Sequence, residues 1–202
     1  MPVAGVLSLQ GDFEAHRKAL AAAGLACVEV RTAEQILAVD GLVLPGGEST
    51  TMWTLMEGTG IEDAIRAVAR SRPILATCAG VILLARKITH PDREGMGLLD
   101  ITAIRNAYGR QLDSAIVTLH DLDRAVLGEA PMEAVFIRAP KLADPGPSVE
   151  VLARREGDPV LVRSGSLLAA TFHPELTDDT RVHGLFAKAV RRAPGTPVRA
   201  VA

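Results

Sequence analysis

The chain has 202 residues, of which 48% are hydrophobic and 23% charged, and its formal net charge is −2. This length suffices for one domain with a substantial core, and a charge so close to zero argues against a nucleic-acid or membrane-surface partner. Two cysteines are too few for a disulfide framework and favour a reducing, cytoplasmic setting. The first residues lack the pattern of a signal peptide, and no apolar run is long enough to cross a bilayer.

The first half of the chain alternates short apolar runs with segments of helical periodicity. The predicted strands cover residues 3–9, 26–30, 41–45 and 73–77. The predicted helices cover residues 12–23, 33–39 and about 60–70. Strands that alternate with helices form parallel sheets covered on both faces, so this half predicts an α/β fold.

The second half changes character, because turn sequences such as ADPGPS and REGDP separate its apolar runs. Its predicted strands cover residues 101–105, 115–119, 133–138, 149–154, 159–163 and 167–172. Strands so closely spaced predict antiparallel pairs. A last helix is expected over 178–192, with Thr177 as its N-cap. We expect one domain over residues 1–192 and a flexible tail at 193–202.

Cys78 lies at the joint between the strand 73–77 and the helical pattern that follows. Ligands of parallel α/β sheets bind beyond the carboxyl ends of the strands, and the positive end of a helix favours a thiolate. The small residues Ala79 and Gly80 keep the turn uncrowded, so we expect an exposed nucleophile on a sharp turn. A buried core thiol is the alternative, and it is the better interpretation of Cys27, which lies within a strand.

A nucleophilic cysteine needs a base, and the base needs an orienting group. His173 and Glu175 stand two residues apart just after a strand, so in extended chain their side chains leave on the same side. A carboxylate beside an imidazole fixes its tautomer, although a solvated loop histidine is the alternative. His16 and His183 have no such partner in the sequence, and we expect His183 on the surface.

The segment LPGGEST, residues 44–50, follows another predicted strand. Its glycines, Gly46 and Gly47, permit positive φ and bring backbone N–H groups close to a ligand, as an oxyanion hole requires. An ordinary turn is the alternative. The sequence contains no phosphate-binding GxxxxGK[ST] motif, and no HExxH, CxxC or EF-hand pattern indicates a metal site.

These pieces, in this order and spacing, make the chain similar to a known family. PGGEST, TCAG and FHPEL resemble the class I (triad) glutamine amidotransferases. More narrowly, the chain resembles the glutaminase subunits of pyridoxal 5'-phosphate synthases from about residue 3 to 190. The segments that carry this likeness are LSLQGDFEAH, DGLVLPGGESTTM, GLLD, RNAYGRQLDS, FIRAP and TFHPELTDD. The resemblance implies a three-layer, flavodoxin-like α/β fold with a mixed, mostly parallel central sheet and helices on both faces.

The resemblance also implies a site. The residues that it assigns to a catalytic triad are Cys78 (nucleophile), His173 (base) and Glu175 (orienting group). The residues that it assigns to glutamine binding are Gly47, Glu48, Ser49, Arg105, Ile137 and Arg138. Arginine is the natural bidentate partner of an α-carboxylate, although a surface arginine is the alternative for both arginines. The Gly46–Gly47 peptide is free to rotate, so that either its N–H or a carbonyl faces the oxyanion.

The implied reaction is hydrolysis of glutamine to glutamate and ammonia. The resemblance implies that the ammonia passes to a (β/α)8-barrel synthase subunit, in a large hetero-oligomer that makes pyridoxal 5'-phosphate, and that this chain binds no cofactor. Ammonia released into water becomes ammonium, so we expect the free subunit to be nearly inactive until its partner docks near Gln10. The other interpretations are the glutaminase of another synthase, a stand-alone cysteine hydrolase and a non-catalytic binding protein.

Overall fold

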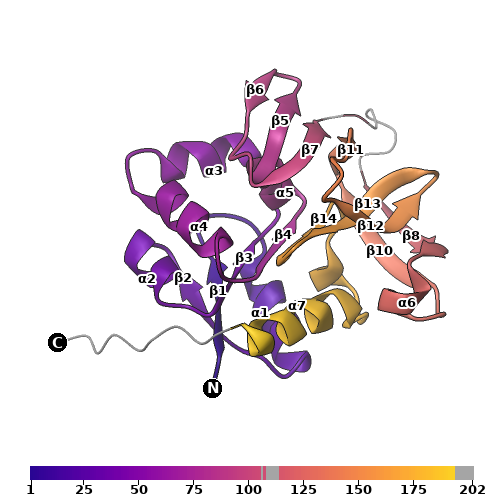
Figure 1. The fold of residues 1–202 in the computed structure, drawn as a ribbon, viewed down its shortest axis with the longest axis horizontal. Helices are drawn as coiled ribbons and strands as arrows, with labels where there is room; N and C mark the ends of the chain where they lie inside the picture. The colour runs from indigo at the N-terminus through magenta and orange to yellow at the C-terminus, as the bar shows by residue number, and fades with distance from the viewer. Residues whose placement is uncertain (106, 108–113, 194–202) are drawn as a thin grey trace.

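The structure, a computed structural model, describes residues 1–105, 107 and 114–193. Its central sheet begins with the parallel strands β1 (Val3–Leu7), β2 (Ala26–Val30), β3 (Gly41–Leu44), β4 (Ile74–Thr77) and β14 (Leu167–Ala170). The antiparallel strands β13 (Asp158–Ser164), β12 (Glu150–Arg155) and β9 (Asp121–Leu122) extend it. Within the described residues, the order across this eight-stranded sheet is β2-β1-β3-β4-β14-β13-β12-β9 (Figure 1).

Helices cover both faces of this sheet. One face carries α2 (Ala33–Leu37), α3 (Ser49–Met56), α4 (Ile61–Ala69) and α5 (Ala79–Leu84). The other face carries α1 (Phe13–Ala22) and α7 (Arg181–Arg192), which lie side by side (Figure 1). The predicted three-layer architecture is therefore confirmed. None of the helices in the described part of the chain is long and apolar enough to cross a membrane.

Successive side chains of a central strand enter two different cores, because a strand alternates its side chains between the faces of the sheet. On β3, Leu42 and Leu44 pack in the core under α2–α5, whereas Val43 packs in the core under α1 and α7. All three are fully buried. Burial on both faces explains why the parallel strands read as unbroken apolar runs.

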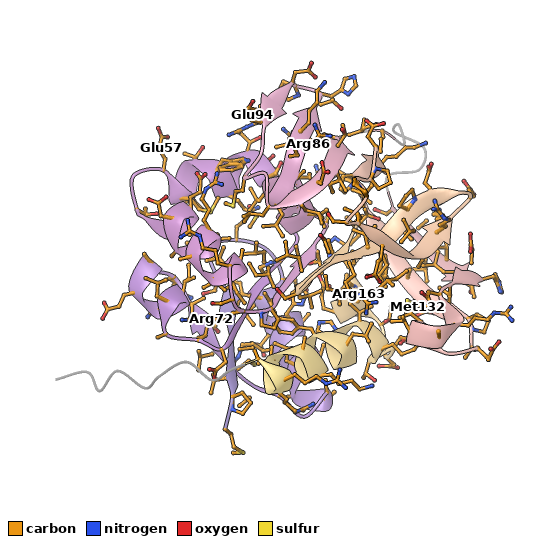
Figure 2. All side chains as sticks on the ribbon, viewed as in Figure 1. Glu57, Arg72, Arg86, Glu94, Met132 and Arg163 are labelled. Carbon is orange, nitrogen blue, oxygen red and sulfur yellow. The ribbon has the colours of Figure 1, made fainter. Side chains whose placement is uncertain are left out.

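Two smaller sheets extend the fold. One has the order β11-β7-β5-β6 and consists of β5 (Ala85–Thr89), β6 (Arg93–Glu94), β7 (Leu99–Ile104) and β11 (Lys141–Ala143). The other pairs β8 (Ser114–Leu119) with β10 (Met132–Ile137). Figure 2 shows Arg86 and Glu94 on the first of these sheets, at the top of the view. Because β7 ends next to Arg105 and β10 ends next to Arg138, these sheets place two predicted site residues.

Several short elements are not predicted from the sequence. They are β5, β6, β9, β11, α3, the helix α6 (Arg124–Leu127) and the 3-10 turn η2 (Pro174–Leu176). Helix α3 has the sequence STTMWTLM, whose three threonines have low helix propensity. The others span only two to five residues, too few to show a period.

The prediction that Thr177 caps the last helix is wrong. Helix α7 begins at Arg181, because Thr177 instead closes the preceding 3-10 turn, where its hydroxyl donates to the carbonyl oxygen of Pro174 at 3.4 Å. Asp179 then accepts a hydrogen bond from the backbone N–H of Arg181 at 3.0 Å and pairs with its guanidinium. The acidic side chain thus stabilises the start of the helix from outside it.

Gly80 is needed for packing, and the expectation that it only keeps the active turn uncrowded is incomplete. A Cβ at this position would clash with the carbonyl oxygen of Leu44 and lie 3.0 Å from its carbonyl carbon, because α5 crosses directly over β3. Gly184 in α7 is the opposite case, since a Cβ there meets no atom within 4 Å.

We therefore predict opposite effects for two glycine-to-alanine substitutions in helices. Gly80→Ala should destabilise the fold by about 1–3 kcal/mol through overpacking, although alanine favours a helix by about 1 kcal/mol. Gly184→Ala should instead raise the free energy of unfolding by up to about 1 kcal/mol. Urea unfolding of both variants checks this, and equal effects of the two substitutions would contradict the packing argument.

Candidate active site

Four parallel strands, β1, β3, β4 and β14, end side by side at one edge of the central sheet. The loops that follow them carry Gln10, Gly47, Cys78 and His173, which line one pocket of about 200 Å³. The other residues that line this pocket are Glu48, Ser49, Ile82, Arg105, Ile137, Arg138 and Pro140. The structure thus brings together the residues expected from the sequence. Gly46 and Glu175 do not line the pocket themselves but lie directly behind His173.

Cys78 directly follows β4 and has the backbone angles φ 47° and ψ −106°. A non-glycine residue with positive φ costs of order 1–3 kcal/mol, and such strain concentrates at functional sites. The Cys78 N–H donates to the carbonyl oxygen of Ala170 on β14 at 2.8 Å, which holds the turn in place. The expectation of an exposed thiol is wrong, since Cys78 is only 6% exposed and its Sγ lies 3.7 Å from the carbonyl oxygen of Ile137.

His173 lies between Cys78 and Glu175. Its Nδ1 is 2.7 Å from Oε1 of Glu175, while its backbone N–H donates to Val135 of β10 at 2.7 Å. Glu175 is 7% exposed and belongs to the 3-10 turn that starts at Pro174. The carboxylate accepts a hydrogen bond from Nδ1–H, so Nε2 is the nitrogen left for exchange of a proton with the thiol.

The pKa values of this group follow from its neighbours. Burial lowers the pKa of His173, but hydrogen bonds to Cys78 and Glu175 and the charges of both outweigh burial and raise it to about 10. Burial raises the pKa of Glu175, but the influence of His16 and His173 is larger and lowers it. An imidazolium held between a carboxylate and a thiolate is the activated state of a cysteine nucleophile.

Gly46 allows the loop after β3 to pack on the triad. A Cβ at this position would clash with Cε1 of His173 and lie 3.2 Å from Cβ of Cys78. The carbonyl oxygen of Gly46 lies against Gly11, where a Cβ would also clash with it. Because the C=O and N–H of a trans peptide point in opposite directions, the N–H of Gly47 is directed away from Gly11.

Glu48 caps the N-terminus of α3. Its carboxylate oxygens accept hydrogen bonds from the backbone N–H groups of Thr50 and Thr51 at 3.0 and 2.7 Å. Burial raises its pKa, but these bonds dominate and lower the pKa to about 2. Arg105 Nη2 lies 3.3 Å from the same carboxylate, and Oε1 of Gln10 accepts the backbone N–H of Glu48 at 3.1 Å. Glu48 is therefore a fixed negative charge at the pocket.

Arg138 also lines this pocket and directly follows β10, with φ 44°. Its guanidinium forms no hydrogen bond or ion pair with another described residue. The two predicted arginines are therefore not equivalent. Arg105 shares its charge with Glu48, whereas the charge of Arg138 is available to an anionic ligand.

Two histidines for which the sequence indicates no role are buried next to Glu175 and Thr77 or to each other. His16 and His183 are both fully buried, so the expectation of a surface position for His183 is wrong. Nε2 of His16 lies 3.4 Å from Oε2 of Glu175 and 3.1 Å from the hydroxyl of Thr77. Nδ1 of His16 lies 3.1 Å from Nε2 of His183.

Part of the expected site segment RNAYGRQLDS lies outside the described residues, namely positions 106 and 108–113. The expected tail also lies outside them, except for Ala193. Within the described ranges, no group of three or more His, Cys, Asp or Glu side chains could hold a metal ion.

A model of the SNO glutamine amidotransferase family matches residues 6–192. The chain belongs to this family. Among the relatives of this amidotransferase, the pyridoxal 5'-phosphate synthase subunit PdxT of Koribacter versatilis is 53% identical, with 93% of this chain and 95% of the relative covered. The protein of the same name from Solibacter usitatus is 50% identical, with 92% and 98% covered.

Solved structures agree with this membership. A structure described as a glutamine amidotransferase is 43% identical and superposes with a TM-score of 0.84, with 93% of this chain and 98% of that chain covered. PurLQS from Thermotoga maritima is only 17% identical, with 94% and 95% covered and a TM-score of 0.66. The latter likeness shows a shared fold alone.

The buried histidines of this amidotransferase predict a loss of stability in mild acid. Burial lowers the pKa of His183 to about 3 and also lowers the pKa of His16, while an unfolded histidine titrates near 6.5. The unfolded state therefore binds more protons than the folded state below pH 6.5. Each of these two histidines then lowers the free energy of unfolding by about 1.4 kcal/mol for every pH unit below 6.5. His173 acts in the opposite direction, because its stabilisation is complete below pH 6.5 and is lost as pH rises through about 10.

We thus expect a stability maximum near pH 6.5. Urea unfolding between pH 7 and pH 5 measures the acid limb. His183→Leu should make this acid limb less steep than in the unmodified chain by about 1.4 kcal/mol per pH unit, the contribution of one bound proton. A flat profile, or an unchanged slope in the variant, would contradict the assignment of neutral buried histidines.

Proposed function

We propose that this chain is the glutaminase subunit of a pyridoxal 5'-phosphate synthase, which hydrolyses glutamine and hands the ammonia to a synthase subunit. The observation that carries this proposal is the contact series Cys78–His173–Glu175, whose first two members line the pocket. The family membership of the chain and its relatives named PdxT support the same activity.

The chemistry begins with the thiolate of Cys78, which attacks the side-chain amide carbon of glutamine. The tetrahedral intermediate collapses to a thioester when His173 gives its proton to the leaving nitrogen, so that ammonia departs. His173 then takes a proton from water, and the hydroxide releases glutamate and restores the thiolate–imidazolium pair. Glu175 stays ionised throughout and stabilises the imidazolium whenever His173 is protonated.

Backbone N–H groups stabilise the oxyanion in this proposal. The N–H of Cys78 itself is not available, because it is bonded to Ala170. The next N–H, of Ala79, starts α5, and the first N–H groups of a helix have no partner within it. The N–H of Gly47 is the second donor, which rotation of the Gly46–Gly47 peptide brings into or out of position.

The ends of the substrate are recognised by fixed charges. Arg138 binds the α-carboxylate of glutamine, and the negative charge of Glu48 attracts the α-ammonium. Arg105 and Ser49 lie at the same pocket, and Arg105 also holds Glu48 in place. The exposed Ile137 contributes the carbonyl group next to the thiol.

The partner in this proposal is a (β/α)8-barrel synthase subunit in a large hetero-oligomer, and the pyridoxal 5'-phosphate is that partner's product. The amidotransferase unit comprises residues 1–192 and acts in the reducing cytoplasm, where a free thiol nucleophile persists. Docking near Gln10, which bonds to the N–H of Glu48, sets the orientation of the neighbouring Gly46–Gly47 peptide.

The test measures ammonia release from glutamine by the purified chain, first alone and then with the barrel synthase. We predict a rate about a hundred- to a thousandfold higher with the partner, which is the effect of one oxyanion donor. Cys78→Ala should abolish the activity in both cases. Cys27→Ala should keep it, because Cys27 is half-buried on the edge strand β2 and does not line the pocket.

An active Cys78→Ala protein would contradict the mechanism. Equal rates with and without the partner would favour a stand-alone cysteine hydrolase, and no hydrolysis in either case would favour a non-catalytic role.

A second prediction concerns substrate recognition. Arg138→Met should raise KM for glutamine roughly tens- to hundreds-fold, because a charge-assisted contact is worth a few kcal/mol. Arg138→Lys should recover part of the loss. Arg163→Met is the control, since Arg163 lies on β13 beside α7 and does not line this pocket. If both methionine variants have the same KM, Arg138 does not bind the substrate.

A further inference from the structure

Glu175 has two oxygens, and the triad uses only one of them. Oε1 accepts a hydrogen bond from His173 Nδ1–H, whereas Oε2 is buried and has no hydrogen-bond partner among the described residues. His16 Nε2 faces Oε2 at 3.4 Å. A buried carboxylate oxygen without a donor is costly, so the protonation state of His16 decides whether this contact stabilises the triad.

The tautomers of both histidines follow from the contacts. If Nε2 of His16 carried no proton, two lone pairs would face each other across 3.4 Å at Glu175, and Nδ1 of His16 would have to donate to His183. Nδ1 of His183, which is buried without a partner, would then carry an unpaired proton. The opposite arrangement avoids both costs. In it, His183 Nε2–H donates to His16 Nδ1, and His16 Nε2–H is directed at Glu175 and Thr77.

We propose that His16 is a positioning residue of the active site, whose Nε2–H holds the outer oxygen of Glu175 so that the inner oxygen stays on His173. His183 fixes the tautomer of His16 from α7. This inference rests on the proposed glutaminase function. His16 does not line the pocket, so its effect is on the alignment of the triad and not on contact with the substrate.

The same contacts join four segments that are distant in the sequence. His16 belongs to α1, Thr77 ends β4 immediately before the nucleophile, Glu175 lies in η2 and His183 lies in α7. The network therefore connects the turn of Cys78 with the turn of His173 from behind. Burial keeps His16 neutral, since it lowers its pKa below the usual value, so His16 acts as a neutral donor.

The test compares two substitutions of His16 in the full chain with its synthase partner. His16→Leu removes the donor, and His16→Gln places an amide N–H near the position of Nε2. His16→Leu should lower kcat about 10- to 100-fold, the usual effect of losing a group that orients a site residue, with KM changed less than about twofold. His16→Gln should restore kcat to within a few-fold. Leu20→Ala, on the buried face of the same helix, is the control that lowers stability without changing kcat.

A second readout does not depend on glutamine. Titration of the His173 imidazole by NMR should show a lower pKa in His16→Leu. Without His16 the carboxylate of Glu175 is no longer held in line with His173, so it forms a weaker hydrogen bond to the imidazolium. The alkaline limb of the kcat profile should then move to lower pH, and His16→Gln should reverse both shifts. The other titratable groups facing this cluster, Cys78, Glu175, His183 and Asp12, are unchanged in all variants.

The inference is overturned if His16→Leu and His16→Gln have the same kcat and the same His173 titration, or if Leu20→Ala reproduces the loss. If the unmodified chain with its partner hydrolyses no glutamine, the proposed function fails, and the NMR titration alone decides the role of His16. If His16→Leu does not fold, His183→Leu against His183→Gln tests the same hydrogen bonds from their far end, with the same expected order of kcat.

Discussion

The site depends on the parallel pairing of β4 with β3 on one side and β14 on the other. The register that pairs Thr77 with Ala170 fixes where both strands end, and the N–H of Cys78 continues this ladder to the carbonyl oxygen of Ala170. His173 follows three residues later, so its distance from the thiol is set by backbone hydrogen bonds and not by flexible side chains. A one-residue slip would turn these strands over and separate the pair.

Burial gives this pairing its chemical effect. The charges of a thiolate, an imidazolium and a carboxylate are costly to remove from water. They persist in a buried site only when each is paired and hydrogen-bonded. His173 satisfies this condition with two partners, and the second oxygen of Glu175 depends on groups behind it. The polar cluster of His16, Thr77 and His183 therefore lies where an apolar core would leave a buried charge incompletely satisfied.

The sequence predicts the central strands and the positions of Cys78, His173 and Glu175 well because both are local signals. Apolar runs mark the central strands, and the segments around Cys78 and His173 are short motifs. Buried histidines are harder, because their partners come from other segments. A helical-period reading would have found part of this signal, since His16 shares a buried stripe with Leu20, and His183 lies among buried residues of α7. The hydrogen bond between them and the contact of His16 with Glu175 depend on how α1, α7 and η2 pack, which no local pattern encodes.

The fold separates the residues proposed for the chemistry from those proposed to recognise the substrate. Cys78, His173 and the glycine loop lie on the central sheet, the part that defines the doubly wound architecture. Arg105 and Arg138 instead follow β7 and β10, which belong to the two smaller sheets. A likeness of fold at 17% identity therefore carries no information about the ligand. The two arginines proposed to lie at the ends of the substrate can change with the smaller sheets, whereas the position of the thiol is fixed by strand pairing within the central sheet.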